Sequence, residues 1–144
     1  MQPLVVLAEE PQEADHEAIL AALLAYNDAA GGPSGYQEVA VLVRHPETGA
    51  TIGGLWGRII YDWLFVELLV VPAEFRGAGL GTQLMQTAEA KARASGCVGV
   101  WLDTFAFQAP DFYRRLGYQQ FGVLPDHPKG RSRFFFMKRL GGAA

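Results

Sequence analysis

Hydrophobic residues occupy every second position along several stretches of the chain, and this pattern predicts β-strands. Within residues 37–44, Val39, Val41 and Val43 take alternate positions, and a period of two residues is typical of a strand with one buried face. The same alternation, or a short run of β-prone apolar residues, predicts six further strands. These lie at residues 3–8, 50–60, 63–71, 98–103, 118–123 and 133–138.

Apolar residues three or four positions apart predict helices between some of these strands. Three helices are expected, at residues 13–30, 80–95 and 109–116. In the second of them Leu84, Ala88 and Ala92 lie one above another, with Met85 beside them, and form the buried stripe. Charged and amide residues such as Glu89 are expected mostly on the opposite, outward side.

The order of these elements predicts one mixed sheet. A helix separates the strand at 63–71 from the strand at 98–103, so these two are expected to be parallel neighbours joined by a right-handed crossover. Short connections make the remaining pairs antiparallel. We therefore expect an α/β (α+β) fold, a single, mostly antiparallel central sheet with helices on both faces. A chain of 144 residues suits one domain, residues 1–144, with a loose tail at 140–144.

Composition narrows the class of protein. Half of the residues are hydrophobic and 19% are charged, which is typical of a globular chain. The net charge of −3 argues against nucleic acid as a partner, because a basic face would be expected. No apolar run approaches the ~20 residues that span a bilayer, and the N-terminus lacks a basic signal-peptide segment. A single cysteine, Cys97, fits a reducing compartment. We expect a cytoplasmic protein with no membrane partner.

The stretch most informative about function is the glycine turn, residues 76–82. It has the sequence Arg76-Gly77-Ala78-Gly79-Leu80-Gly81-Thr82 and stands between a predicted strand and a predicted helix. Glycines let the backbone approach an anion closely. The first turn of the helix adds unpaired N–H groups and the positive end of the helix dipole. The layout predicts a phosphate-binding turn, and a plain glycine-rich helix cap is the alternative.

The spacing within the glycine turn excludes two common phosphate-binding motifs. The dinucleotide fingerprint G-x-G-x-x-G needs a third glycine where this chain has Thr82 or Leu84, and the P-loop needs a lysine after Gly81. What remains is Arg76-x-x-Gly79-x-Gly81. It resembles the Gln/Arg-x-x-Gly-x-Gly/Ala motif of the GCN5-related N-acetyltransferases (GNAT). The resemblance implies that the backbone amides of this turn hold the pyrophosphate of acetyl-coenzyme A.

A second stretch, residues 109–118, resembles the next motif of that family, Ala-x-x-Phe-Tyr-x-x-x-Gly-Phe/Tyr. The matching positions are Ala109, Phe112, Tyr113, Gly117 and Tyr118. The resemblance extends over about residues 50–123 and is loose elsewhere. Many relatives carry an asparagine shortly before this helix that bonds the pantetheine arm. This chain has no asparagine there, and Gln108 is the candidate substitute.

The resemblance implies a set of cofactor-binding residues. Backbone groups of Leu69 and Val71 are expected to bond the pantetheine amides, as an added strand would. Arg76 either pairs with a phosphate or caps the turn, and both interpretations stay open. The full set is Leu69, Val71, Arg76, Gly77, Ala78, Gly79, Gly81, Thr82, Gln108 and Phe112.

Two residues are the candidates for catalysis. Relatives use the tyrosine of the second motif as the acid that protonates the leaving thiolate, which implies this role for Tyr113; aromatic packing is the alternative. Glu67 lies within an apolar strand, where relatives often place a glutamate that acts as a base through water. Partial desolvation there would raise its pKa. Asp103 and Asp62 are the alternative bases.

The reaction implied is direct transfer of an acetyl group from acetyl-coenzyme A to a primary amine of a small molecule or peptide, in a ternary complex. The alternatives are a non-catalytic acyl-coenzyme A binding domain, or a transferase of another acyl group. No residue spacing suits a metal, so none is expected. Similar proteins are frequently dimers, which makes a homodimer one expected state. Five aromatic residues are expected mostly in the core, with one or two lining the acceptor pocket: Trp56, Trp63, Trp101, Phe105 and Phe107.

Overall fold

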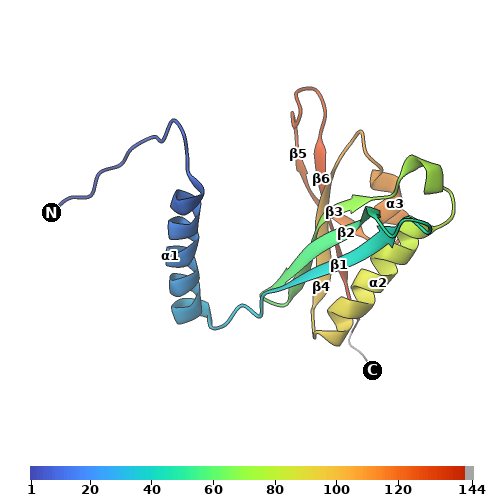
Figure 1. Cartoon of the computed structure of the whole chain (residues 1–144), viewed down its shortest axis with the longest axis horizontal. Coiled ribbons are helices and arrows are strands. Elements are labelled where there is room, and N and C mark those ends of the chain that lie inside the picture. The colour runs from blue at the N-terminus through green and yellow to red at the C-terminus, as the bar shows by residue number, and fades with distance from the viewer. Residues whose placement is uncertain (142–144) are drawn as a thin grey trace. The chain divides into compact units, whose positions relative to one another are not determined.

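The computed structural model describes residues 1–141 and divides the chain into two compact units. The first is Met1–Ser34, and the second begins at Gly35. Each unit is described by itself below, and Figure 1 labels their elements.

The first unit contains one helix, α1 (Glu13–Gly31), as the sequence predicts. The helix begins after Gln12, whose backbone N–H donates a 3.0 Å hydrogen bond to the Asp15 carboxylate, and it ends at Gly32, which has a φ of 77°. The strand predicted at residues 3–8 is wrong, because this stretch has no strand structure and its apolar side chains are exposed. A strand needs a neighbour that accepts its backbone hydrogen bonds, and among residues 1–141 this stretch has none.

The second unit is built on a six-stranded sheet in the order β1-β2-β3-β4-β6-β5 (Figure 1). β3 and β4 are parallel, as predicted, and the other neighbours are antiparallel. The mixed α+β class is therefore confirmed. The elements are β1 (Gln37–Arg44), β2 (Thr51–Ile60), β3 (Trp63–Val70), a 3-10 turn (Ala73–Phe75), α2 (Leu80–Ala94), β4 (Gly99–Phe105), α3 (Pro110–Arg115), β5 (Gln119–Leu124) and β6 (Arg133–Arg139).

Both helices of the second unit pack on the same face of the sheet. α2 contacts β1 to β4 through its buried residues Leu84, Met85, Ala88 and Ala92, which is the predicted stripe. On α3, the Tyr113 ring contacts Phe136 of β6. Side chains two positions apart on a strand point to the same side, and Lys138, two positions after Phe136, bonds Glu89 of α2. We call the opposite side of the sheet the open face. Helices on both faces of the sheet remain a prediction, because α1 belongs to the other unit.

Two residues are more buried than the sequence suggests. Glu89 is 4% exposed and accepts hydrogen bonds from Tyr118 at 2.7 Å and from Lys138 at 3.1 Å, so its expected outward position is wrong. Leu140, expected in the loose tail, is buried, and its N–H bonds the carbonyl of Val98. Residues 142–144 of that expected tail lie outside the described residues.

The feature of the sheet that matters most for function is the parting of β3 and β4. Their pairing ends at Val66 and Leu102. Beyond these residues β3 stays paired with β2 as far as Val70, whereas β4 stays paired with β6 as far as Phe105. Glu67 is an extra residue at this point, since Val66 pairs with Gly57 and Leu68 pairs with Trp56. Such a bulge bends a strand, and here it coincides with an opening between two central strands.

Candidate active site

The glycine turn forms one wall of a cavity of about 340 Å³, which we call the phosphate cavity. It lies where the end of β3, the start of α2 and the helix α3 meet. Most of the predicted cofactor-binding residues line it, but Leu69, Ala78 and Gln108 do not. The lining residues are Val71, Phe75, Arg76, Gly77, Gly79, Leu80, Gly81, Thr82, Phe112 and Arg115.

The start of α2 offers this cavity a set of unpaired backbone donors. The first intrahelical hydrogen bond runs from Gln83 N to Gly79 O at 3.0 Å, so the N–H groups of Leu80, Gly81 and Thr82 have no acceptor inside the helix. Gly79 caps the helix with a φ of 78°, a left-handed conformation that favours glycine. The first turn carries no acidic residue. The arrangement is suited to an anion.

Gly81 lets α3 approach the start of α2. A Cβ atom at this position would lie 3.1 Å from the ring of Phe112, which is tighter than ordinary contact. Phe112 can therefore close one side of the phosphate cavity only because residue 81 has no side chain.

Two arginines border the phosphate cavity. Arg76 Nε donates a 2.9 Å hydrogen bond to the carbonyl of Val71, so Arg76 does cap the turn; a phosphate contact by the rest of its guanidinium stays a prediction. The same bond engages the Val71 carbonyl that was expected to serve pantetheine. Arg115 on α3 also lines the cavity. The sequence analysis missed it, because the second motif leaves this position variable.

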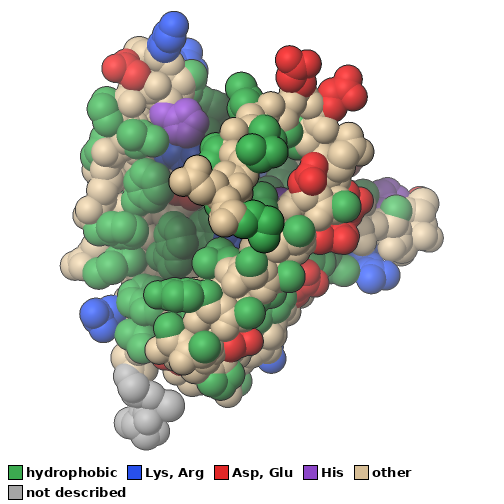
Figure 2. Space-filling model, turned by 90° about the vertical axis from the view of Figure 1, so that its left-hand side faces the viewer, with side chains coloured by type: hydrophobic (Ala, Val, Ile, Leu, Met, Phe, Trp, Pro, Cys, Tyr) green, Lys and Arg blue, Asp and Glu red, His purple; other side chains and the backbone are tan. Residues whose placement is uncertain are grey.

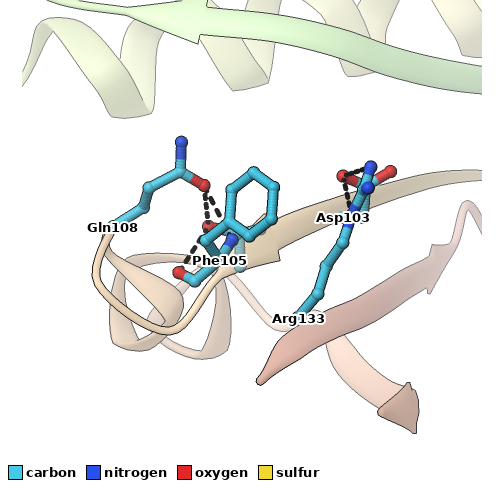
Figure 3. Close-up of polar contacts among 5 residues, drawn as sticks. Asp103, Phe105, Gln108 and Arg133 are labelled. Atoms are coloured by element: carbon cyan, nitrogen blue, oxygen red, sulfur yellow. Dashed lines mark hydrogen bonds and ion pairs between the residues drawn. The ribbon is translucent and has the colours of Figure 1, made fainter. Parts of the chain in front are cut away.

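Beyond Val66 the edge of β3 is no longer covered by β4, and β3 runs from there towards Val71 in the wall of the phosphate cavity. Leu69 lies beyond the last β3–β4 pair. Its side chain packs against the core, and its backbone belongs to the edge of β3 that β4 no longer covers. On the β4 side, the side chain of Gln108, in the loop that follows β4, folds back towards Phe105 at the end of that strand (Figure 3). Its Oε1 accepts hydrogen bonds from Phe105 N at 2.7 Å and Thr104 Oγ1 at 3.0 Å. Only the amide nitrogen of Gln108 is left for a ligand.

Tyr113 has the surroundings of a proton donor. It is buried, and its ring contacts Phe112, Tyr118 and Phe136. Burial raises the pKa of Tyr113 to about 12, and the negative charge of Asp103 adds to the rise. Within residues 1–141 no group accepts a hydrogen bond from its hydroxyl, so this proton is available to a ligand.

The carboxylates of Glu67 and Asp103 flank the point where the strands part. Glu67 lies 3.9 Å from the guanidinium of Arg58, and its side chain is 46% exposed, so the expected desolvation is limited. Asp103 Oδ1 accepts hydrogen bonds from Nε, at 2.9 Å, and Nη2 of Arg133. Asp62, the third candidate base, is in the β2–β3 turn at the far end of β3 and is not part of this site.

A second cavity of about 340 Å³ lies on the open face, and we call it the aromatic cavity. Trp63 and Trp101 line it, whereas Trp56 and Phe107, also expected in the core, are 40% and 55% exposed. In the view of Figure 2, hydrophobic side chains lie next to one another on part of the surface that faces the viewer. The residues of the aromatic cavity are Ile60, Tyr61, Trp63, Trp101, Phe121 and Met137.

Residues 1–141 contain neither a metal-binding cluster nor a membrane-spanning helix. Among residues 1–141 there is no cluster of three or more His, Cys, Asp or Glu side chains placed to hold a metal ion. None of the helices in that part of the chain has the length and apolar character needed to cross a membrane.

Comparison with known proteins agrees with this geometry. The model of the acetyltransferase (GNAT) family matches residues 6–118. The chain belongs to the GNAT family of acetyltransferases. It is therefore a transferase.

Three relatives of this GNAT chain illustrate the match. Blasticidin-S acetyltransferase of Streptomyces morookaense is 46% identical over 95 residues, which are 65% of this chain and 70% of the relative. Acetyltransferase Atu2258 of Agrobacterium fabrum is 35% identical over 135 residues, 94% of this chain and 98% of the relative. A crystal structure from Agrobacterium tumefaciens superposes with a TM-score of 0.90 at 33% identity, covering 96% of this chain and 100% of its own.

A more distant structure shares the fold and was determined with coenzyme A. It is an aminoglycoside 6′-N-acetyltransferase complexed with coenzyme A, with a TM-score of 0.62 at 17% identity, covering 89% of this chain and 81% of its own. At this identity the likeness concerns the fold.

Proposed function

We propose that this GNAT protein is an acetyl-coenzyme A-dependent N-acetyltransferase that acts on a primary amine of a small molecule. The observation that carries the proposal is that β3 leads from the point where it parts from β4, after Val66, to Val71 in the wall of the phosphate cavity. A diphosphate and an extended thioester arm need these two features in this order. The family match over residues 6–118 supports one acetyltransferase domain, although a homodimer and a cytoplasmic location remain predictions.

Acetyl-coenzyme A would lie along β3. Its pyrophosphate would accept hydrogen bonds from the backbone N–H groups of residues 80–82, with Arg76 and Arg115 supplying positive charge. Its pantetheine amides would pair with the exposed backbone edge near Leu69, and the amide nitrogen of Gln108 could bond the arm from the β4 side. The thioester would then reach the opening beside Tyr113.

The chemical step is direct. The amine nitrogen attacks the thioester carbonyl carbon and forms a C–N bond, after which the C–S bond breaks. An ammonium substrate first gives one proton to the base and becomes a neutral amine. As the C–N bond forms and the C–S bond breaks, the nitrogen loses a second proton and the leaving sulfur gains one. Holding both reactants in the opening replaces a bimolecular collision, which is a large part of such catalysis.

Tyr113 is the donor to the leaving sulfur in this scheme. With a pKa of about 12, its phenol is fully protonated at neutral pH. A free thiol has a pKa of about 8.5, so complete proton transfer to a solvated thiolate would be uphill. Transfer becomes easier where the thiolate itself is desolvated, because burial disfavours its charge as well. Tyr113 therefore donates a hydrogen bond as charge develops on the sulfur, and completes the proton transfer within the buried site.

Glu67 is the base in this scheme. It lies at the bulge, beside the opening, and its exposure leaves room for a water molecule between its carboxylate and the incoming amine. A base acting through one water is within the reach that general base catalysis requires.

The acceptor class draws support from a relative. The protein that shares 46% identity over 95 residues is named blasticidin-S acetyltransferase, and it supports a small-molecule acceptor here. A peptide acceptor and a non-catalytic acyl-coenzyme A binding domain are the competing functions.

The test is a screen of polyamines, aminoglycosides, amino acids, arylalkylamines and peptides, with release of free thiol from acetyl-coenzyme A as the readout. Turnover of an amine that Tyr113→Phe slows by about 10²-fold, with the dissociation constant of coenzyme A nearly unchanged, supports the proposal. Binding of acetyl-coenzyme A without turnover of any amine would favour the non-catalytic domain. Turnover only with longer acyl-coenzyme A thioesters would reassign the acyl group.

A further inference from the structure

The open face carries a fixed carboxylate next to the opening. Asp103 is the first residue of β4 beyond the last pair with β3. The guanidinium of Arg133 holds its Oδ1 and is itself placed over the rings of Phe105 and Phe135, at 5.1 and 5.7 Å. Figure 3 shows Asp103 and Arg133 pointing towards one another from neighbouring strands.

This ion pair leaves one acceptor atom unused. Both hydrogen bonds of Arg133 go to Oδ1, and in the described part of the chain no donor bonds Oδ2 of Asp103. The Asp103 side chain is 16% exposed, so a small ligand can reach it. Oδ2 of Asp103 carries part of the negative charge of the carboxylate and has no donor, so it suits a charged hydrogen-bond donor such as an ammonium group.

The aromatic cavity lies on the same face, and its wall residue Trp101 is on the same strand as this carboxylate. Trp101 precedes Asp103 by two positions on β4, so both side chains point to the open face about 7 Å apart along the strand. Trp101 stacks on Phe65, with ring centroids 4.2 Å apart, and it lines the aromatic cavity with Trp63, Tyr61 and Phe121. Aromatic walls of this kind favour a flat ring over a saturated one.

We infer that the acceptor is a primary amine joined by a short linker to a planar ring. Its ammonium group binds Oδ2 of Asp103, and its ring lies in the aromatic cavity against Trp101. This inference rests on the proposed function and names the substrate class of the same site. Asp103 is then a specificity-determining residue, which places the nitrogen at the opening where Glu67 takes its proton.

A matched pair of amines tests the ring. 2-Phenylethylamine and 2-cyclohexylethylamine have the same head group and linker, but only the first has a planar ring. Binding of each to the full-length protein saturated with coenzyme A is measured by calorimetry, a readout that needs no turnover. We expect the phenyl compound to bind about two- to tenfold more tightly. Equal affinities, or no binding of either amine, would overturn the inference.

Variants test the two contacts separately. Asp103→Asn keeps an oxygen for Arg133 but removes the charge, and should weaken binding of the phenyl amine by about tenfold or more. Phe121→Leu changes an exposed cavity wall without touching the core, and should erase the preference for the phenyl compound. Glu47→Gln in the exposed β1–β2 turn is the control and should change neither. An Asp103→Asn variant with unchanged amine affinity would also overturn the inference.

The same experiments separate this inference from the proposed function. Acetyl-coenzyme A binding with turnover of saturated and planar amines alike would refute the ring pocket and leave the acetyltransferase intact. Binding of planar amines without thiol release would refute the transferase and leave the pocket. In kinetic terms, Asp103→Asn should raise KM for the amine, while KM for acetyl-coenzyme A stays unchanged.

Discussion

The hydroxyl of Tyr118 donates a hydrogen bond of 2.7 Å to the carboxylate of Glu89, and this bond joins the end of the second GNAT motif to the helix of the first. Lys138 of β6 bonds the same carboxylate at 3.1 Å and the carbonyl of Leu116 at 2.9 Å. One buried carboxylate thus connects α2, β6 and the end of α3. Because α2 and α3 border the phosphate cavity, this network holds two walls of the site together.

Replacing Glu89 by leucine should destabilise the protein. The change leaves the Tyr118 hydroxyl without its acceptor and the Lys138 ammonium without its counter-charge, in a largely buried place, and breaking such a pair from one side typically costs about 3–5 kcal/mol. Partial exposure of Lys138 puts the expectation at the lower end of that range. Urea unfolding measures it. Asp111→Asn, which breaks an exposed ion pair with Arg114, is the control and should cost less than about 1 kcal/mol.

Gly79→Val should weaken coenzyme A binding. The φ of 78° at this position is strained for a β-branched residue, and the side chain would enter the space expected for the pyrophosphate. Titration of coenzyme A by calorimetry measures the effect, with a loss of about tenfold or more in affinity expected.

The control for that variant is Gly49→Val. Gly49 has a φ of 73°, and a Cβ atom there would meet nothing within 4 Å. The two variants therefore share the backbone strain and differ in the nearby ligand. Equal coenzyme A affinity in both would remove the argument for a phosphate site at the start of α2.

Arg115→Gln should weaken coenzyme A binding and reduce its dependence on salt. A charge-assisted hydrogen bond to a phosphate contributes about 1.5–3 kcal/mol, which corresponds to an affinity loss of about 10- to 100-fold, and screening by salt falls when one ionic contact is lost. Dissociation constants measured from about 50 to about 300 mM salt, over which the Debye length shortens, would show this. Arg44→Gln on β1 is the control; a parallel salt dependence in all three proteins would contradict the role of Arg115.

Much of this architecture could be predicted from the sequence, because periodicity reports which side of an element is buried. The predicted strand at 37–44 has the same bounds as β1, and the helix predicted at 80–95 differs from α2 by one residue. The glycine turn that lines the phosphate cavity could be recognised for a different reason. Gly77, Gly79 and Gly81 lie between a predicted strand and a predicted helix, and this local pattern indicates a turn whose backbone can approach an anion closely.

The residues that sequence reasoning missed depend on distant partners or on geometry without a local signal. Glu89 lies four positions after Met85, on the buried stripe, but only Tyr118 and Lys138 make its burial favourable, and they are remote in sequence. Arg115 lies three positions after Phe112, hence on the same side of α3, which is the signal that could have identified it. The bulge at Glu67 has no signature in the strand pattern. The prediction of a strand at 3–8 was wrong because apolar residues alone do not supply a neighbouring strand to pair with.

The raised pKa of Tyr113 should make stability fall above pH 10. In the unfolded chain this phenol ionises near its ordinary pKa of about 10, whereas burial in the folded protein raises the pKa to about 12. Between these values the unfolded chain loses the proton and the folded protein keeps it, so rising pH favours unfolding. The contribution of Tyr113 is complete below pH 10 and is lost as pH rises towards 12, a change of about 2–3 kcal/mol.

Urea unfolding of the native protein and of Tyr113→Phe measures this change. The unfolding is followed at about pH 8, 9.5, 10.5 and 11.5, which bracket the roughly two-unit interval between the two pKa values. The difference in unfolding free energy should be constant at the two lower pH values and shrink at the two higher ones. A constant difference throughout would show that the Tyr113 hydroxyl is not desolvated, and would remove the physical basis for its role as the buried proton donor.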